Sequence, residues 1–197
     1  LLLSLPERTA ALLGNTDRPV ALIYAGKAHP RDAAGKEIVA RVLAAANRPE
    51  LEGRVIFLED YDIGIGRALV QGIDVWINNP RRPREASGTS GQKVSMNGGL
   101  NCSTLDGWWI EGYRLEPLAG WAVGDDAIWE DVEAGDRADR EALYRTLEED
   151  VVPLFFRHEG GLPRAWIGRM RAAIEAGLPA FNTERMVADY VRKAYLR

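Results

Sequence analysis

The chain has 197 residues, which is enough for one domain with a substantial hydrophobic core. Its apolar content of 46%, charged content of 27% and net charge of −4 are ordinary for a soluble globular protein, and they give no basic footprint for nucleic acid. The single cysteine, Cys102, excludes an internal disulfide, which fits a cytoplasmic protein, and no apolar run reaches the roughly 18 residues of a membrane-spanning helix.

Apolar runs and periodic apolar positions predict alternating helices and strands in the first third of the chain. A capping box at Ser4–Glu7 predicts a helix at about Leu5–Leu13. The continuous apolar runs Val20–Ala25 and Val55–Leu58 predict buried parallel strands. Between them, the amphipathic pattern of Asp32–Asn47 predicts a second helix.

Polar residues follow both predicted strands. In open α/β sheets ligands bind beyond the carboxyl ends of the strands, so Lys27 and His29 are candidates to line a cleft. The alternative is that both belong to a loop that only turns the chain. The acidic stretch Glu59–Asp62 is either a metal site or a solvated loop, and because no convergent ligand set is visible we predict no metal.

The rest of the chain continues the alternation and then becomes helical. The expected elements are a helix at Ile63–Gln71, strands at Ile73–Ile77, Leu100–Ser103 and Gly120–Gly124, an acidic loop at Asp125–Asp136, and helices at Arg137–Phe156, Leu162–Ala176 and Thr183–Ala194. Pro153 is expected to kink or interrupt the first of these three helices, and Thr183 is expected to cap the last. This order predicts an α/β fold with a parallel sheet flanked by helices.

The most informative stretch, Asn78–Tyr113, contains a dense run of small residues that cannot form a core. If a helix begins near Thr89, its first-turn N–H groups point at one spot and favour an anion there. Gly88 and Gly91 permit the backbone angles that such a turn requires, and Lys93 lies one turn into the helix. The stretch therefore predicts a phosphate cradle with a lysine beside it; the alternative is a Gly/Ser-rich turn before an ordinary surface helix.

Two neighbouring groups have roles that the sequence leaves open. Arg81, Arg82 and Arg84 either contact phosphate or form partly solvated surface that faces another domain. The paired tryptophans Trp108 and Trp109 bury large areas, so core packing is the expected role for both.

The segment Glu85–Asn101, EASGTSGQKVSMNGGLN, followed by LDGWWIEGY, resembles the pyridoxal-phosphate segment of the glycogen (α-glucan) phosphorylases, and most of all their bacterial branch that carries DGWW. The resemblance continues through VIFLEDYDIG, AGKAHP and MVADYV, so it covers nearly the whole chain. It implies a Rossmann-like C-terminal domain of the two-domain GT-B architecture. The family keeps the DGWW segment beside the active site, so Asp106 and Gly107 are expected to shape that site.

The resemblance also implies roles for single residues. Lys93 matches the lysine that forms a Schiff base with pyridoxal 5′-phosphate, and Gly88 and Thr89 match the residues that hold the cofactor phosphate. Glu85 matches the glucosyl ligand, so the implied catalytic site contains Glu85 and Lys93. Tyr61 matches a tyrosine near the cofactor.

The implied activity is that of an α-glucan phosphorylase, a glycosyltransferase that moves a glucosyl unit from α-1,4-glucan to inorganic phosphate with retention and yields glucose 1-phosphate. The 5′-phosphate of the cofactor exchanges a proton with the substrate phosphate in such enzymes. A phosphate has its second pKa near 6, which suits proton transfer near neutral pH. The implied partners are α-1,4-glucan and inorganic phosphate, with a homo-oligomer as a further option and no nucleic acid or membrane.

The resemblance also implies that this chain is a fragment of a larger enzyme. Leu1–Leu3 looks like the middle of an element, so we expect residues 1–197 to form a single C-terminal domain whose first strand and N-terminal domain are absent. Such a fragment is expected to be inactive alone.

Two other functions stay open. Transferases of the glycogen-synthase type share the GT-B architecture but carry Glu-x7-Glu where this chain has Glu85-x7-Lys93, which favours the phosphorylase. The other alternative is a non-catalytic glucan-binding or regulatory domain.

Overall fold

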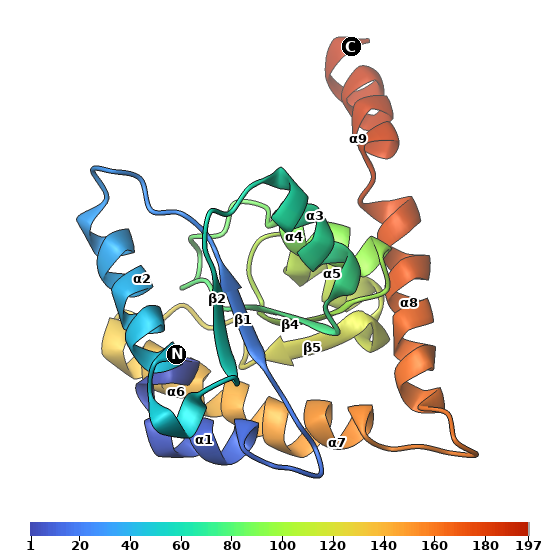
Figure 1. Cartoon of the computed structure of the whole chain (residues 1–197). Coiled ribbons are helices and arrows are strands. Elements are labelled where there is room, and N and C mark those ends of the chain that lie inside the picture. Colours follow the sequence, from blue (N-terminus) through green and yellow to red (C-terminus); the bar gives the residue numbers. More distant parts are fainter. Residues whose placement is uncertain (197) are drawn as a thin grey trace. The chain divides into compact units, whose positions relative to one another are not determined.

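A computed structural model describes residues 1–196 as helices that alternate with parallel strands and then follow one another toward the C-terminus (Figure 1). The chain divides into two compact units, of which the first is Leu1–Leu69 and the second begins at Val70. The boundary falls within helix α3 (Ile63–Gly72). All strands are parallel and are flanked by helices, which confirms the predicted α/β class.

The first unit is built around two parallel strands, β1 (Leu22–Ala25) and β2 (Val55–Leu58). Leu22 pairs with Val55, and both side chains are buried in the small core of this unit. Both predicted strands are therefore present and parallel, and β2 has the predicted bounds, but the predicted burial is wrong because Ile23 and Ile56 are exposed. The other elements are η1 (Leu2–Ser4), α1 (Pro6–Leu13), α2 (Ala33–Ala46), which packs against β2, and η2 (Pro49–Leu51).

The helix caps of the first unit only partly follow the prediction. The capping box at Ser4–Glu7 is wrong, because the N-cap of α1 is Leu5 and the Ser4 hydroxyl donates to the carbonyl of Leu1 instead. Asp32 caps α2, since its carboxylate accepts a hydrogen bond of 2.9 Å from the backbone N–H of Gly35. Both predicted helices are present all the same.

The second unit contains a three-stranded parallel sheet with strand order β3–β4–β5. Strand β4 lies in the middle and every one of its residues is buried. Helix α4 lies in the connection from β3 to β4, α5 lies in the connection from β4 to β5, and α6 packs against β5 (Figure 1). The bounds are β3 (Val75–Asn78), α4 (Thr89–Met96), β4 (Leu100–Thr104), α5 (Trp108–Leu115), η3 (Pro117–Ala119), β5 (Gly120–Val123) and α6 (Val132–Arg145).

The C-terminal part is helical, as predicted, but α6 begins at Val132, so the acidic loop predicted at Asp125–Asp136 is wrong from that residue on, and one later helix has a different cap. Pro153 lies in the first turn of α7, directly after a π-helical segment, so the run from α6 to α7 stays helical and changes its hydrogen-bond pattern before the proline. Asn182 rather than Thr183 caps α9, because its side chain accepts from the backbone N–H of Arg185. The elements are a π-helical segment (Thr146–Val151), α7 (Val152–Phe155), α8 (Arg164–Ala180), α9 (Thr183–Tyr190) and a second π-helical segment (Val191–Tyr195).

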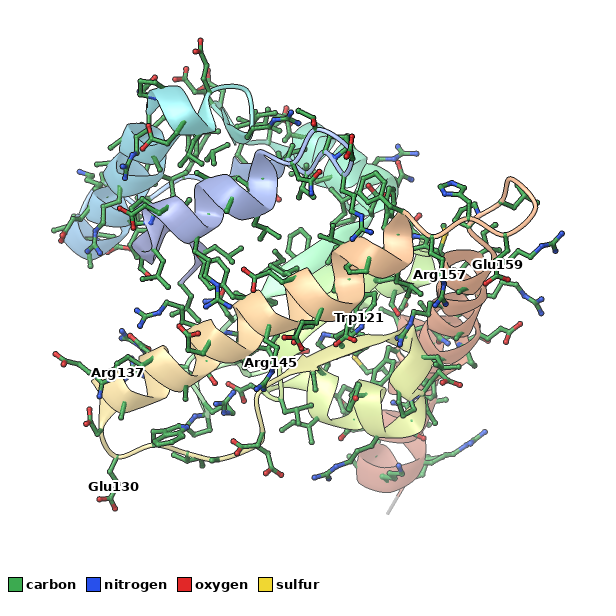
Figure 2. All side chains as sticks on the ribbon, turned by 90° about the horizontal axis from the view of Figure 1, so that it is seen from below. Trp121, Glu130, Arg137, Arg145, Arg157 and Glu159 are labelled. Atoms are coloured by element: carbon green, nitrogen blue, oxygen red, sulfur yellow. The ribbon has the colours of Figure 1, made fainter. Side chains whose placement is uncertain are left out.

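Aromatic side chains fill much of the core of the second unit. Trp121 of β5 lies beside the helical run of α6 and α7 (Figure 2), and its ring centroid is 5.8 Å from that of Trp166 of α8. The guanidinium of Arg169 covers the Trp121 ring at 4.5 Å and donates to the carbonyl of Gly120. These contacts attach α8 to the sheet. Among residues 1–196, no helix has both the length and the apolar character needed to cross a membrane.

Candidate functional site

The N-terminus of α4 is free to receive an anion. Gly88 is the N-cap residue with φ +89°, a left-handed conformation that disfavours residues with a Cβ, and no side chain caps this helix end. The N–H groups of the first turn have no acceptor within the helix, so they remain available to a ligand. The helix begins at Thr89, as predicted.

Lys93 brings an amine to the same end of the helix. Its Nζ lies 3.5 Å from the Thr89 hydroxyl oxygen, because residues four apart share one face of a helix. Both residues are exposed, so a ligand can reach the amine and the hydroxyl together. An amine, a hydroxyl and a helix N-terminus in one place fit a ligand that carries both a carbonyl and a phosphate group.

Glu85 lies next to this helix end, on the loop Pro80–Gly88, which we call the cradle loop. A Cβ added at Gly88 would lie 3.6 Å from the Glu85 carboxyl carbon, and one added at Gly107 would lie 2.9 Å from its Cγ. The Glu85 side chain therefore lies close to both glycines. Its backbone N–H donates to the Asp106 carboxylate at 2.9 Å. The structure thus brings Glu85, Gly88, Thr89 and Lys93 together on one loop and one helix.

Two buried side chains support the first turn of α4. The Asn101 amide of β4 donates to the carbonyl of Gly91 at 3.1 Å. A Cβ at Gly91 would lie 2.6 Å from the Asn101 side-chain oxygen and 2.9 Å from Trp108 Nε1. Only glycine fits between them, so Gly91 allows the close packing that fixes the turn. Trp108 in turn packs edge-on against Phe181, with ring centroids 4.9 Å apart.

Two arginines of the cradle loop bind helix α6. Arg81 makes a two-pronged ion pair with Asp136, at 2.8 and 2.7 Å. Arg82 donates to the Asp139 carboxylate at 2.6 Å and to the Ala127 carbonyl at 2.9 Å, and only 4% of its side chain is exposed. Both of the roles left open for Arg82, phosphate contact and solvated surface, are therefore wrong. It is a buried structural residue that fastens the cradle loop.

The candidates in the first unit are more scattered. Lys27 lines a cavity of about 480 Å³ beyond the ends of β1 and β2, together with Lys36, Glu59 and Asp60. His29 is exposed, and its Nδ1 accepts from the backbone N–H of Arg31, which fits the alternative that it only turns the chain.

Tyr61 also belongs to the first unit, whereas the four residues of the cradle belong to the second. Its ring packs over Gly66 of α3, where an added Cβ would lie 2.5 Å from the phenol oxygen. Within residues 1–196, no group of three or more His, Cys, Asp or Glu side chains is arranged to hold a metal ion.

Cys102 takes no part in thiol chemistry at this site. It is fully buried in β4, and burial raises the pKa of its thiol to about 12. A thiol with such a pKa is neutral near pH 7 and is a poor nucleophile.

Several residues of the site could not be assigned from the sequence. Asn101 reads as an ordinary strand residue, and Arg82 reads as one of three similar surface arginines. The one available signal was the charge of Asp136 and Asp139, which lie three residues apart and so share a helix face. The pairing with two consecutive arginines becomes visible only in three dimensions.

Comparison with known proteins agrees with this geometry. The sequence profile of the family described as Carbohydrate phosphorylase matches residues 9–115. A glycogen phosphorylase of Aquifex aeolicus is 48% identical over 190 residues, which are 96% of this chain and 27% of the relative. A maltodextrin phosphorylase of Thermococcus litoralis is 44% identical over 99% of this chain and 23% of the relative.

A glycogen phosphorylase of Mycobacterium tuberculosis is 43% identical over 99% of this chain and 22% of its own length. The chain thus spans about a quarter of the length of these relatives. The profile match covers more than half of the chain and includes all of α4 and its lysine. The resemblance seen in the sequence is confirmed: the chain belongs to the carbohydrate phosphorylase family.

Proposed function

We propose that this chain carries the cofactor-binding and glucosyl-binding half of an α-glucan phosphorylase. The whole enzyme would transfer a glucosyl unit from the end of an α-1,4-glucan to inorganic phosphate and release glucose 1-phosphate. The observation that carries this proposal is the uncapped N-terminus of α4, with Lys93 Nζ 3.5 Å from the Thr89 hydroxyl and Glu85 beside Gly88. Family membership supports it, because phosphorylases of this family use pyridoxal phosphate in general.

The residues present fit pyridoxal phosphate. The glycine cap at Gly88 leaves the first-turn N–H groups of α4 without a side-chain acceptor, and a phosphate would satisfy them. The Thr89 hydroxyl adds a donor, and the exposed Lys93 amine can bond covalently to the cofactor aldehyde. Pyridoxal phosphate supplies, when bound, a phosphate group whose second pKa near 6 suits proton exchange with the substrate phosphate.

The protein groups would then orient the reactants. The N–H groups at the α4 N-terminus would hold one phosphate through the backbone and not through a mobile side chain. Glu85, close to Gly88 and Gly107, accepts hydrogen bonds from hydroxyl groups of the glucosyl unit. Lys93 anchors and does not attack the sugar. The contact of Tyr61 with the cofactor, which the resemblance implies, stays a prediction.

The chain would act as the C-terminal Rossmann-like domain of a longer two-domain enzyme. It spans about a quarter of the length of its relatives. The remaining substrate contacts would come from an N-terminal domain. Its relatives include a glycogen phosphorylase and a maltodextrin phosphorylase, and both glycogen and maltodextrin are α-glucans.

Phosphorolysis by the full-length protein tests the proposal. Maltodextrin and inorganic phosphate should give glucose 1-phosphate, and Lys93→Ala should abolish that activity together with the bound cofactor. Lys193→Ala, an exposed lysine 70% accessible at the C-terminal end, is the matched control and should leave both unchanged. Transfer from a nucleoside-diphosphate glucose without phosphorolysis would instead indicate the synthase-type alternative.

A further inference from the structure

Asp106 is a buried carboxylate with two backbone partners at the site. Only 5% of the residue is exposed. Its Oδ2 accepts from the N–H of Glu85 at 2.9 Å, and its Oδ1 accepts from the N–H of Gly107 at 2.9 Å. Each oxygen is therefore used by a different segment, one from the cradle loop and one from the turn that begins α5.

The same two segments meet again at the two residues that follow Asp106. The N–H of Trp108 donates to the carbonyl of Ser87 at 2.8 Å. Gly107 has φ +54°, and a Cβ there would lie 2.7 Å from the Ser87 carbonyl oxygen and 2.9 Å from Glu85 Cγ. The backbone of residues 106–108 therefore packs directly against the backbone of Glu85 and Ser87. A small displacement of this turn would move Glu85.

A carboxylate suits this position because both of its oxygens are acceptors. An asparagine has the same shape but offers one acceptor oxygen and one NH₂ donor, so it can serve only one of the two N–H groups and opposes the other. The two backbone contacts thus require aspartate specifically. This makes the isosteric change Asp106→Asn a precise perturbation, which alters hydrogen bonding without changing volume.

We propose that Asp106 is the positioning residue for Glu85, holding its backbone so that the side-chain carboxylate meets the glucosyl unit in one fixed orientation. The proposal rests on the function proposed above, in which Glu85 is the glucosyl ligand. Asp106 does not touch substrate or cofactor in this account. It acts through the Glu85 N–H and through the glycine turn that lies against the Glu85 side chain.

Amide hydrogen exchange tests the anchoring without any reaction. In the chain itself, Asp106→Asn should raise the exchange rate at the Glu85 or Gly107 amide by about tenfold, as expected for one lost hydrogen bond. Asp126→Asn, which removes an exposed carboxylate paired only at 3.8 Å with Arg114, is the matched control and should change neither amide. Unchanged exchange at both amides would overturn the proposal.

A double-mutant cycle in the full-length enzyme tests the positioning role. Asp106→Asn should lower kcat/KM for phosphorolysis by about 10- to 100-fold, since a misplaced contact group of this kind costs that much. In a Glu85→Gln background the same change should cost less than about threefold, because the group that Asp106 positions is already lost. An equal loss in both backgrounds would mean that Asp106 acts through general stability, and would overturn the proposal.

The two proposals fail in different ways. Full activity of Glu85→Gln would remove the glucosyl role of Glu85, and with it both the proposed site and the positioning role, whatever the exchange rates show. A large loss in Glu85→Gln with no loss in Asp106→Asn would leave the proposed function standing and overturn this inference alone. If Asp106→Asn does not fold, Gly107→Ala provides a steric version of the same test, because its Cβ would press on Glu85 Cγ.

Discussion

Removal of the Asp139 carboxylate should destabilise the second unit far more than removal of the Asp136 carboxylate. The two aspartates lie on α6 and pair with consecutive arginines of the cradle loop. The Arg82–Asp139 pair is buried, with 4% and 11% of the side chains exposed, whereas the Arg81–Asp136 side chains are 54% and 31% exposed. The pairs therefore differ mainly in their contact with water.

The expected magnitudes follow from that difference. Asp139→Ala leaves the Arg82 guanidinium buried without a counter-charge, which costs about 3–5 kcal/mol of unfolding free energy. Asp136→Ala breaks a solvated pair, which is worth about 0–1 kcal/mol. With a urea m value of about 2 kcal/mol per molar, the first change should lower the unfolding midpoint by about 1.5–2.5 M and the second by no more than about 0.5 M.

Tryptophan fluorescence is the appropriate assay. All six tryptophans follow Val70 in the sequence, so the signal reports the second unit alone. The double variant Arg82→Met/Asp139→Leu should recover most of the stability lost in Asp139→Ala, because it removes both buried charges together. Equal midpoints for Asp139→Ala and Asp136→Ala would refute the view that burial of the Arg82 pair holds the cradle loop to α6.

Three further outcomes follow from the structure. Gly91→Ala should lower the free energy of unfolding by about 1–3 kcal/mol and weaken cofactor binding, because its Cβ would lie 2.6 Å from the Asn101 oxygen. Gly168→Ala, whose Cβ would have no atom within 4 Å, should stabilise α8 by about 0.5–1 kcal/mol. Urea midpoints check both changes in stability. Cys102 should resist a thiol-specific reagent such as Ellman's in the native chain and react fully in denaturant, since burial raises its pKa to about 12; rapid native reaction would contradict its burial. Arg81 holds the pKa of Asp136 below its ordinary value, so the pair stabilises the fold above the unfolded pKa of about 4. This contribution disappears as the pH falls through the lower pKa of the folded state. In an acid titration, Asp136→Asn should therefore lose less unfolding free energy than the wild type over that range.

The sequence predicted well those elements whose signal is local. Strand β2 is a continuous run of four apolar residues, a pattern that indicates a strand by itself. Its observed bounds are the predicted ones. The start of α4 at Thr89 follows from Gly88, whose left-handed conformation few other residues adopt. The residues of the predicted cradle, Glu85 to Lys93, lie within nine residues of one another, so their proximity is a local feature that the sequence indicates.

The failures occur where distant groups decide the outcome. Helix α5 begins directly at Trp108, without a capping side chain, because Gly107 and the Ser87 carbonyl fix its start from outside the helix. Ser4 had the right spacing for a capping box but its hydroxyl found the Leu1 carbonyl instead. Arg82 and Asp139 are 57 residues apart, so no local pattern could have shown that one buried pair joins them.

Covalent labelling of Lys93 by pyridoxal phosphate tests the central claim most directly. The purified chain would be incubated with pyridoxal phosphate, reduced with borohydride, digested and mapped by mass spectrometry, with Lys93→Ala as the control. The proposed cradle predicts one dominant adduct at Lys93, saturating at low cofactor concentration and blocked by excess inorganic phosphate that competes for the α4 N-terminus. Equal labelling of Lys93 and exposed lysines such as Lys27 and Lys193, unaffected by phosphate, would contradict it.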